Sequence, residues 1–483
     1  MDSRNYGNER WHISFGSYSG PERTAVDMVY GLVQGFVPYV LTAAPVGEAL
    51  PETVRNRILV GTLKDNPELE RLAQEGFFRP QTAPEGYSIK CAPAPEQNDC
   101  FLVVIQGSDS AGVLYAAVDF ERYAVRDRAA YAGEPVRRKY RPFQAGLPVF
   151  ERSSAPRIEH RGFWSWGHVI YDYRSYIDHM CACKLNTLIL WNDYVPLNAS
   201  QVVAYAHDHA VKVIFGFSWC WGEKVDPDSP EDLEKWTKSV LDTYEGQYRD
   251  LGCDGIYFQA FTETNDTTIG DRSISELVID WVGAISRRVY ERYPDLWIQF
   301  GLHATSIRGE CGKFAAIDPR MSIVWEDAGG FPYDYDPARL GDPEETCAYT
   351  EELLAIRGKE ERFGAVFKGF TVLDWDAFEH QKGPFVLGEA APSFLRERQA
   401  EKAYFWRYVA PYWMKQADVL QRMLQTIADA PVRDRLVTAL VEDGMWECGM
   451  HVSAQLFAEL AWDPAGDVPE ILTALLHDGR SVL

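Results

Sequence analysis

The chain has 483 residues, of which 46% are hydrophobic and 25% are charged. These proportions are ordinary for a globular protein, and they exclude an extensively disordered chain. The formal net charge of −23 repels polyanions, so nucleic acid and anionic membrane surfaces are excluded as partners.

The N-terminal residues 1–5 are followed by no apolar stretch, so we expect no secretory signal. No run of 18 apolar residues occurs further along the chain, and we therefore expect no membrane span. The nine cysteines are odd in number and show no repeated spacing. Cys181 and Cys183 flank a single alanine, which is not a zinc-binding spacing. Reduced thiols and a cytoplasmic location are the simplest interpretation.

Residues 1–150 predict a small α/β domain. Residues 57–61 and 101–105 are short apolar runs typical of buried strands, and residues 86–90 alternate like a half-buried strand. A helix is predicted to begin near Ser110. A segment rich in Pro, Gly and Arg then follows and separates this domain from the rest of the chain.

From residue 157 apolar strand runs alternate with helical stretches, which predicts a parallel sheet built of βα units. We expect a (β/α)₈ TIM barrel over residues 157–392 and a helical region over residues 393–483. An open doubly wound sheet is the alternative, although no glycine-rich phosphate loop follows the first strand. The predicted barrel strands are 158–166, 187–194, 212–219, 255–262, 296–304, 322–328 and 365–375, with a weak eighth strand at 384–389.

Active sites of such barrels lie at the carboxyl ends of the strands, which directs attention to polar residues at those ends. On the fourth strand Gln259 and Glu263 fall on the face that should point inward, since Ile256 and Phe258 suit the helix layer. A carboxyl group placed there among aromatic side chains is suited to donate a proton. The alternative is that Glu263 belongs to an ordinary surface loop.

Later strands supply further candidates. The fifth strand directs His303 inward, either to bind a substrate or to form local hydrogen bonds. The sixth strand ends in Glu326 and Asp327, and alternation does not choose between them because both faces before them are apolar. The seventh strand places Lys368 and Asp374 on one face, where they either serve the site or pair structurally.

Aromatic residues also gather at strand ends, interleaved with Asn, Asp and His. Sugar rings pack on aromatic faces while their hydroxyl groups find polar partners, so these residues predict the wall of a polyol pocket. A place in the core is the alternative. The expected substrate-binding residues are Trp164, Trp166, His168, Asn192, Asp193, Trp219, Trp221, Gln259, His303, Trp325 and Trp375.

These features together favour a glycoside hydrolase, because cleavage of a glycosidic bond needs two carboxyl groups. Glu263 is the predicted acid, and a carboxylate from the later strands (Glu326, Asp327 or Asp374) is the predicted nucleophile or base. We expect exo action on a terminal sugar of a small glycan or glycoside, without a cofactor. A metal site at His207 and His209 is disfavoured because both lie in the middle of a helical stretch, and a homo-oligomer is left open.

Two other functions fit the same residues. A carbohydrate-binding barrel that lacks catalysis would use the aromatic pocket alone. A lyase or isomerase acting on a sugar acid would use His303 and Lys368 as acid and base.

Several segments resemble known glycoside hydrolases. Residues 57–62, 85–89 and 105–116 look like the N-terminal domain of family 20 β-N-acetylhexosaminidases and family 67 α-glucuronidases. Residues 161–163 and 184–188 resemble the first βα unit of their barrels, and residues 453–464 are similar to C-terminal segments of relatives.

The resemblance implies an acid at Glu263, with the second carboxylate at Asp327 or Asp374 if the order of the α-glucuronidases holds. The hexosaminidases carry Asp-Glu after the fourth strand, whereas Thr262 precedes Glu263 here. The likeness therefore does not extend to substrate-assisted cleavage of an N-acetyl sugar.

Overall fold

The computed structural model describes residues 10–36, 41–50, 54–95, 97–126, 149–192, 194–220, 224–303, 306–328, 343–370, 383–441, 443–477 and 481–482. The chain divides into two compact units, one made mainly of residues 1–156 and the other mainly of residues 157–476. None of the helices in the described part of the chain has the length and apolar character to cross a membrane. None of the nine cysteines, all of which the structure describes, forms a disulfide.

The first unit is a mixed six-stranded sheet with helices on both faces. The strands follow the order β2-β1-β3-β5-β4-β6. Strands β2, β1, β3 and β5 are parallel, and β4 pairs antiparallel with β5 on one side and with β6 on the other. Helices α1 and α3 pack on each other and on the sheet, and α2 covers another part through Leu69 and Leu72. The elements are β1 (Arg10–Phe15), α1 (Gly20–Phe36), β2 (Leu41–Pro45), β3 (Val54–Thr62), α2 (Pro67–Gln74), β4 (Tyr87–Ala94), β5 (Gln97–Gly107), α3 (Ser110–Glu121) and β6 (Phe150–Ser154).

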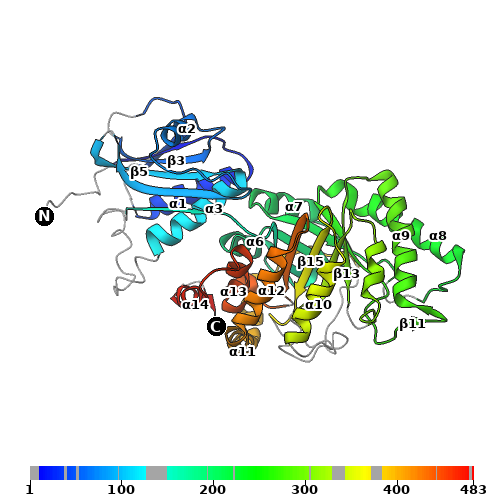
Figure 1. The fold of residues 1–483 in the computed structure, drawn as a ribbon. Helices are drawn as coiled ribbons and strands as arrows, with labels where there is room; N and C mark the ends of the chain where they lie inside the picture. The colour runs from blue at the N-terminus through cyan, green and yellow to red at the C-terminus, as the bar shows by residue number, and fades with distance from the viewer. Residues whose placement is uncertain are drawn as a thin grey trace. The chain divides into compact units, whose positions relative to one another are not determined.

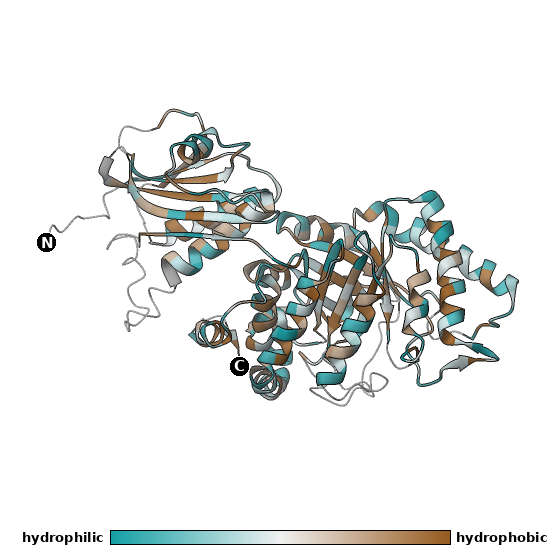
Figure 2. Cartoon of the chain, in the orientation of Figure 1, coloured by the Kyte–Doolittle hydropathy of each residue, from teal (hydrophilic) through white to brown (hydrophobic). Residues whose placement is uncertain are grey.

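The second unit contains a closed barrel of eight parallel strands (Figure 1). Most of the strands run through buried, apolar residues, and Figure 2 shows them largely in brown. This confirms the predicted (β/α)₈ barrel. The strands are β7 (His160–Trp166), β8 (Thr187–Trp191), β9 (Lys212–Gly216), β10 (Gly255–Gln259), β13 (Trp297–Leu302), β14 (Ser322–Ala328), β15 (Arg362–Phe367) and β16 (Asp434–Leu440).

The eighth strand differs from the prediction. β16 closes the barrel by pairing with β15 on one side and β7 on the other, so the expected eighth strand at 384–389 is wrong. Two helices, α11 (Pro392–Lys415) and α12 (Ala417–Asp429), lie between β15 and β16. The barrel therefore does not end at residue 392, because the region after that residue holds the last strand as well as helix α13 (Val452–Trp462).

Helices surround the strands, and their buried faces form the main core with the outward-facing strand residues. A short 3₁₀ turn, Cys311–Ala316, stands between β13 and β14 in place of a longer helix. The helices are α6 (Tyr173–Ala182), α7 (Ala199–Asp208), α8 (Pro230–Thr243), α9 (Ile274–Arg292), α10 (Pro343–Ala355), α11 (Pro392–Lys415), α12 (Ala417–Asp429), α13 (Val452–Trp462) and α14 (Val468–His477). Two-stranded ribbons are formed by β11 (Thr268–Ile269) with β12 (Arg272–Ser273), and by β17 (Met450–His451) with β18 (Ser481–Val482).

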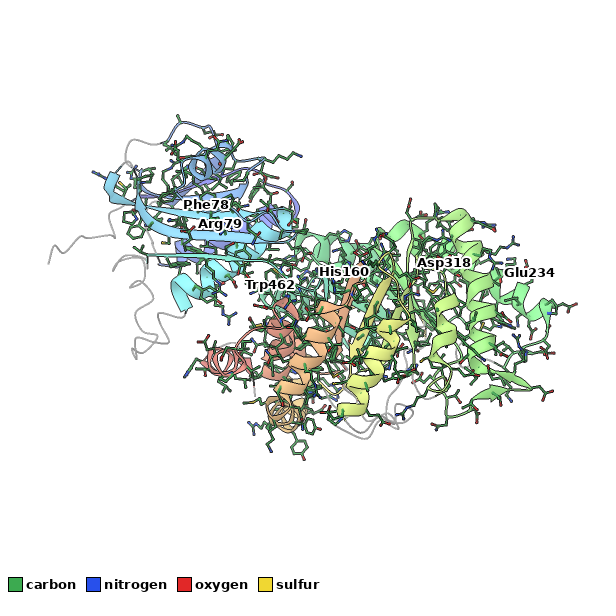
Figure 3. All side chains as sticks on the ribbon, in the orientation of Figure 1. Phe78, Arg79, His160, Glu234, Asp318 and Trp462 are labelled. Carbon is green, nitrogen blue, oxygen red and sulfur yellow. The ribbon has the colours of Figure 1, made fainter. Side chains whose placement is uncertain are left out.

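The amino-terminal end of the barrel is closed by side chains. The His160 ring lies 4.6 Å from the Trp297 ring, and the Arg362 guanidinium lies 5.7 Å from the same ring. His160 is labelled in Figure 3. Burial and neighbouring cations hold the pKa of His160 well below its ordinary value. A neutral, packed plug of this kind serves stability, which leaves the opposite end for chemistry.

Two of the segments that resemble family 20 and family 67 enzymes, residues 161–163 and 184–188, lie together at the first βα unit. The Asn186 side chain accepts a hydrogen bond from the Arg161 backbone at 2.8 Å. The Arg161 guanidinium donates to the carbonyl groups of Ile158 and Lys184 at 2.6 and 3.1 Å. Gly162 has no room for a Cβ atom, since one would collide with the Thr187 carbonyl. These residues join β7 to β8, so the motif specifies the architecture.

Candidate active site

A buried carboxylate occupies the carboxyl-terminal end of the barrel. Glu326, on β14, is 3% exposed and receives hydrogen bonds from the hydroxyl of Tyr257 and the amide of Gln259. The two Gln259 contacts measure 2.8 and 2.6 Å. His303 Nε2 lies 3.2 Å from Glu326 Oε2, and Lys368 Nζ lies 4.0 Å from the same oxygen. Four side chains from three neighbouring strand ends therefore converge on one carboxyl group.

Glu263 stands beside this cluster. Its Oε1 atom lies 3.7 Å from His303 Nε2, and its side chain is 23% exposed, compared with 4% for the Glu326 side chain. The loop that carries Glu263 is fixed by Thr262, whose hydroxyl accepts from the His303 backbone at 3.2 Å and whose carbonyl accepts from Ser306 at 2.8 Å. The structure thus brings together Glu263, Glu326, Gln259 and His303, which the sequence had placed on three separate strand ends.

Tyr257 is a site residue that sequence reasoning missed. It falls on the same face of β10 as Gln259, so the alternation that pointed to Glu263 also pointed to it. Burial and the negative charge of Glu326 raise the pKa of Tyr257 well above its ordinary value, so its hydroxyl stays a donor. Gly301, which pairs with Gln259 in the sheet, leaves the space in which Tyr257 and Glu326 meet, because a Cβ there would collide with both.

The end of the seventh strand departs from the predicted alternation. Lys368 points inward as expected, but it pairs with Glu326. Gly369 has a φ of +90°, which ends the extended backbone directly after Lys368. Phe370 consequently stacks on Trp413 of α11 at 4.4 Å and does not face the mouth. The prediction that the strand runs to residue 375 is therefore wrong, since β15 ends at Phe367.

Tryptophan side chains line the inside of the barrel across from the carboxylates. Trp164 and Trp166 on β7 and Trp191 on β8 belong to one cluster with Tyr257. The Trp164 ring stacks against Trp191 at 6.3 Å and meets Trp166 edge-on at 4.8 Å. Trp191 was not among the predicted binding residues, although it lies in the same register as Trp166. This group, Trp164, Trp166 and Trp191, is called the aromatic wall below.

Two predicted pocket residues lie on the helix side of the barrel. Trp219 stacks on Phe258 at 3.8 Å, and Trp325 packs edge-on against Tyr349 of α10 at 5.4 Å. Both side chains are fully buried in the core between strands and helices. Both rings therefore turn away from the predicted pocket, because Trp219 falls in step with the outward-facing Phe215 and Phe217, and Trp325 alternates with the inward-facing Glu326.

The remaining predictions fall on the first two strand ends or outside the described residues. Asn192 is 4% exposed, and neither side-chain atom has a hydrogen-bond partner among the residues that the structure describes. His168 is partly buried in a 3₁₀ turn just after β7. Asp193, Trp221, Asp374 and Trp375 lie outside the described residues, as does the side chain of Asp327. Within the described ranges no group of three or more His, Cys, Asp or Glu side chains could hold a metal ion.

Comparisons with known proteins agree with the fold. No protein-family model matches the chain, and no curated protein sequence is similar to it. A solved GH138 enzyme targeting pectin rhamnogalacturonan II is similar over 95% of this chain at 12% identity and a TM-score of 0.50. The chain spans about half of that protein, 52% of its length.

Two further structures are more distant. The structure of CpGH84D is similar over 95% of this chain and 67% of its own length, at 11% identity and a TM-score of 0.49. An O-GlcNAc hydrolase of Thermobaculum terrenum is similar over 67% of this chain and 64% of its own length, at 10% identity and a TM-score of 0.41. The specific resemblance to families 20 and 67 stays a prediction. At 12% identity the similarity to the GH138 enzyme shows the barrel fold alone.

Proposed function

We propose that this chain is a glycoside hydrolase whose two catalytic carboxyl groups are Glu263 and Glu326. One observation carries the proposal: both carboxyl groups lie against the same nitrogen atom, His303 Nε2, at 3.7 and 3.2 Å. Two carboxyl groups at the mouth of such a barrel are what cleavage of a glycosidic bond requires. The glycoside-hydrolase barrels among the structural neighbours support the same reaction class.

The surroundings of the two groups support different roles. Glu326 receives hydrogen bonds from Tyr257 and Gln259, and an ionised carboxyl group, which only accepts, satisfies both donors. This suits a nucleophile or a base, so Glu326 is preferred over Asp327 and Asp374 for that part. Glu263 is more exposed, and an acid must reach the oxygen of a leaving group that departs toward solvent.

The separation of the two groups admits either stereochemical outcome. Since both oxygens contact one nitrogen, they lie at most about 7 Å apart, which admits both the spacing of about 5–5.5 Å in retaining enzymes and the lower end of about 6.5–9.5 Å in inverting ones. The stereochemistry of the product is therefore a measurement to make.

The aromatic wall supports a sugar substrate. A ring held against Trp166 or Trp191 would present its C–H face to the indole and its anomeric carbon toward the carboxyl groups across the barrel. The amide of Asn192 is free to bind hydroxyl groups at the edge of this wall. The substrate of the GH138 neighbour, pectin rhamnogalacturonan II, places plant cell-wall glycans among those to be tested.

The connection before α11, residues 383–391, supports exo action. It is tied to the loop after β8 by the Asn198 side chain, which exchanges two hydrogen bonds of 2.9 Å with the Leu387 backbone. It is tied to the loop after β7 by bonds from Tyr173 to Gly388 at 3.1 Å and from Ala390 to Tyr171 at 2.9 Å. A rim joined across these loops favours a pocket over an open cleft, and a pocket takes a chain end.

The test is release of nitrophenol from a panel of α- and β-aryl glycosides, followed by pectic and other plant oligosaccharides. We expect turnover by the wild-type protein and a loss of at least a thousandfold in Glu263→Ala and Glu326→Ala, with Glu360→Ala as an exposed control. Loss in Glu263→Ala should be smaller with good leaving groups, since an acid matters less for them. Azide should restore activity to Glu326→Ala if Glu326 is the nucleophile.

Three results would contradict the proposal. Glycan binding without turnover, unchanged in both variants, would indicate a binding protein. A product that gains no ¹⁸O from labelled water would indicate a lyase or isomerase. Full activity in both variants, with the fold verified by thermal melting, would remove both catalytic assignments.

A further inference from the structure

His303 is a buried histidine between the two proposed catalytic carboxyl groups. It directly follows β13, and its side chain is 0% exposed. Its Nε2 atom lies 3.2 Å from Glu326 Oε2 and 3.7 Å from Glu263 Oε1. Neither ring nitrogen makes a hydrogen bond of regular geometry among the described residues. Nε2 is therefore within reach of both carboxyl groups and is hydrogen-bonded to neither.

The surroundings of the ring favour the tautomer that carries its proton on Nε2. A lone pair on Nε2 would face the ionised Glu326 at the shorter of the two distances, which is repulsive, whereas an N–H is attracted to it. Nδ1 is buried and has no hydrogen-bond partner among the described residues, so an imidazolium ring would leave a donor unsatisfied there. The partners thus indicate a neutral ring with one N–H, for which two acceptors compete.

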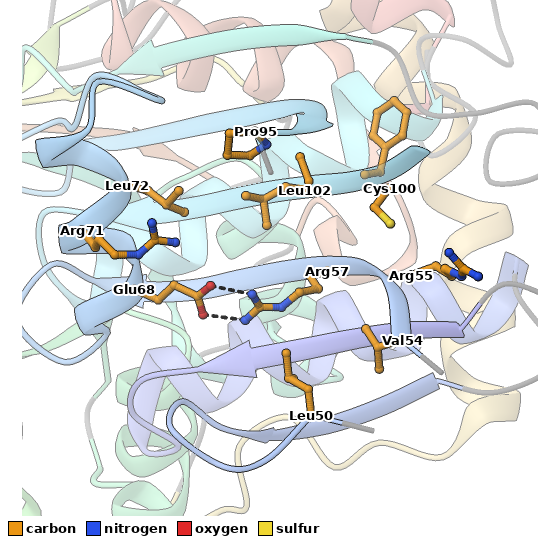
Figure 4. Close-up of a pocket in the computed structure, with 12 residues that line it drawn as sticks. Leu50, Val54, Arg55, Arg57, Glu68, Arg71, Leu72, Pro95, Cys100 and Leu102 are labelled. Carbon is orange, nitrogen blue, oxygen red and sulfur yellow. Dashed lines mark hydrogen bonds and ion pairs between the residues drawn. The ribbon is translucent and has the colours of Figure 1, made fainter. Parts of the chain in front are cut away.

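A charge pair in the N-terminal unit shows the difference. The Arg57 nitrogens Nη1 and Nη2 each donate to a separate oxygen of Glu68 (Figure 4). Each oxygen of that carboxyl group has a donor of its own, so the pair needs no exchange of partners. His303 has a single donor for two carboxyl groups from different strand ends. The group that carries the negative charge attracts this N–H more strongly, because a hydrogen bond to an ionised acceptor is the stronger one.

Glu326 keeps its position without the His303 N–H. Its oxygens accept hydrogen bonds from the Tyr257 hydroxyl and from the Gln259 amide, and the two Gln259 contacts measure 2.8 and 2.6 Å. The Lys368 ammonium lies 4.0 Å from Oε2. These groups hold and stabilise the carboxyl group when the histidine donates elsewhere.

The His303 backbone stays close to Glu263. Its N–H donates to the Thr262 hydroxyl at 3.2 Å, and Thr262 directly precedes Glu263. The histidine ring and the Glu263 loop are therefore tied together. Rotation of the ring alone can change which of the two carboxyl groups receives its hydrogen bond.

The proposed reaction moves a negative charge between these two groups. In the first step of a retaining reaction, Glu263 gives its proton to the leaving-group oxygen as the glycosidic bond breaks, and a Glu326 oxygen bonds to the anomeric carbon. Glu263 is then a carboxylate and Glu326 an uncharged ester. In the second step, water gives a proton to Glu263 and its oxygen displaces Glu326, which restores both groups. In an inverting reaction Glu326 takes a proton from the attacking water, so the charge moves in the same direction.

We propose that His303 is a positioning residue whose Nε2–H turns from Glu326 to Glu263 as the negative charge passes between them. The inference rests on the proposed function, since it assigns a role within that reaction. The ring itself gains and loses no proton. It donates to Glu326 while that group is the carboxylate, and it stabilises Glu263 as a carboxylate once Glu263 has given up its proton.

A titration that needs no substrate tests this exchange. Glu326→Gln imitates the uncharged state of Glu326, and ¹³C NMR follows the Glu263 carboxyl group, whose signal is identified by its loss in Glu263→Gln. Removal of the Glu326 charge by itself lowers the pKa of Glu263, so the substitution is repeated together with His303→Phe, which has no ring N–H. We expect Glu326→Gln to lower the pKa of Glu263 by at least about 0.5 pH unit more when His303 is present. An equal fall with and without His303 would overturn the proposal.

Kinetics test the role in turnover. His303→Phe should lower kcat about 10- to 100-fold with little change in KM, and the acid limb of the pH profile should move to higher pH, because the ionised carboxyl group loses a donor. His303→Gln keeps an N–H donor and should be more active than His303→Phe. His477→Phe replaces an exposed histidine of α14 and should act like wild type. Thermal melting verifies the fold, and the smaller His303→Leu replaces His303→Phe if the latter does not fold.

A purely structural role for His303 predicts the opposite pattern. His303→Phe, which keeps a packed ring, would then be the more active of the two variants, and the pH profile would not move. That result would overturn the proposal. Absence of turnover by the wild-type protein would instead contradict the proposed function, while the carboxyl titration would still decide whether the hydrogen bond changes partners.

Discussion

A buried carboxyl group near the mouth of the barrel gives a quantitative prediction. Glu447, in the loop after β16, is 6% exposed, and its Oε1 atom accepts a hydrogen bond of 2.7 Å from the Tyr171 backbone. Its other oxygen is buried without a hydrogen-bond partner among the described residues. Burial raises the pKa of Glu447 from 4.5 to about 7, although the backbone hydrogen bonds act in the opposite direction.

The perturbation is Glu447→Gln, which keeps the shape and the acceptor but never ionises. Because the pKa of Glu447 is higher in the folded than in the unfolded state, the folded protein binds more protons between these values. The stability of the wild type therefore falls as the pH rises from 4.5 through about 7. At about 1.4 kcal/mol per pKa unit, the full effect is about 3 kcal/mol, of which about 2 kcal/mol lies between about pH 5.5 and 8.5.

The assay is thermal melting of both proteins across this pH range. Relative to wild type, the melting temperature of the variant should rise by about 4 °C from the lowest to the highest pH, at about 2 °C per kcal/mol for a large domain. The offset at low pH measures the amide substitution itself, and only the pH-dependent part reports the charge. Glu360→Gln, an exposed control, should follow the wild type. Parallel profiles for Glu447→Gln and wild type would refute the reasoning, since ionisation of Glu447 would then cost the folded protein nothing extra.

Three further substitutions test the packing of the site and of the N-terminal unit. Tyr257→Phe removes a hydrogen-bond donor to Glu326 and should lower kcat about 10- to 100-fold, which corresponds to the free energy of one hydrogen bond to a charged group. The variant should still bind glycan. An unchanged kcat would show that this hydrogen bond does not serve catalysis. Gly301→Ala should abolish turnover and lower the free energy of unfolding by about 1–3 kcal/mol, because a Cβ at this position collides with the side chains of Tyr257 and Glu326. The control is Gly312→Ala, whose Cβ would meet nothing within 4 Å, and it should act like wild type. Burial raises the pKa of Glu22 to about 7, so the melting temperature of Glu22→Gln should rise relative to that of wild type as the pH rises from 4.5 through 7. A difference in melting temperature that does not change with pH would contradict this.

The barrel could be predicted from the sequence because seven of its strands are short apolar runs between helical stretches. The eighth could not. β16 follows the long helices α11 and α12. Its seven residues begin with Asp434 and Arg435, and the five that remain, 436–440, are an apolar stretch interrupted by Thr438 that is too short for periodicity to separate strand from helix. Its place is set by pairing with β15 and β7, two strands distant in the sequence. Residues 384–389 seemed the better candidate only because they lie next along the chain.

The inward-facing residues could be predicted where a strand has one polar face. On β10 the residues Tyr257 and Gln259 alternate with Ile256 and Phe258, and the structure places the first pair inside the barrel and the second in the outer core. The same alternation also accounts for Trp219. Its backbone still bonds to Gln259 of β10, and it falls in step with Phe215 and Phe217, which face the outer core, so its ring turns outward onto Phe258.

On β14 alternation alone could not choose, because Val324 and Trp325 are equally apolar. The hydrogen-bond donors on the neighbouring strands determine which residue of β14 points inward. Tyr257 and Gln259 are buried donors inside the barrel, and buried donors require an acceptor. The residue of β13 in register with Gln259 is Gly301, which offers no side chain and leaves the space open. The acceptor must then come from the next strand, β14, and an inward Glu326 supplies it while Trp325 turns to the helices. A satisfied carboxylate held in this way is also one that is fixed in position, which is what a nucleophile or base facing Glu263 needs.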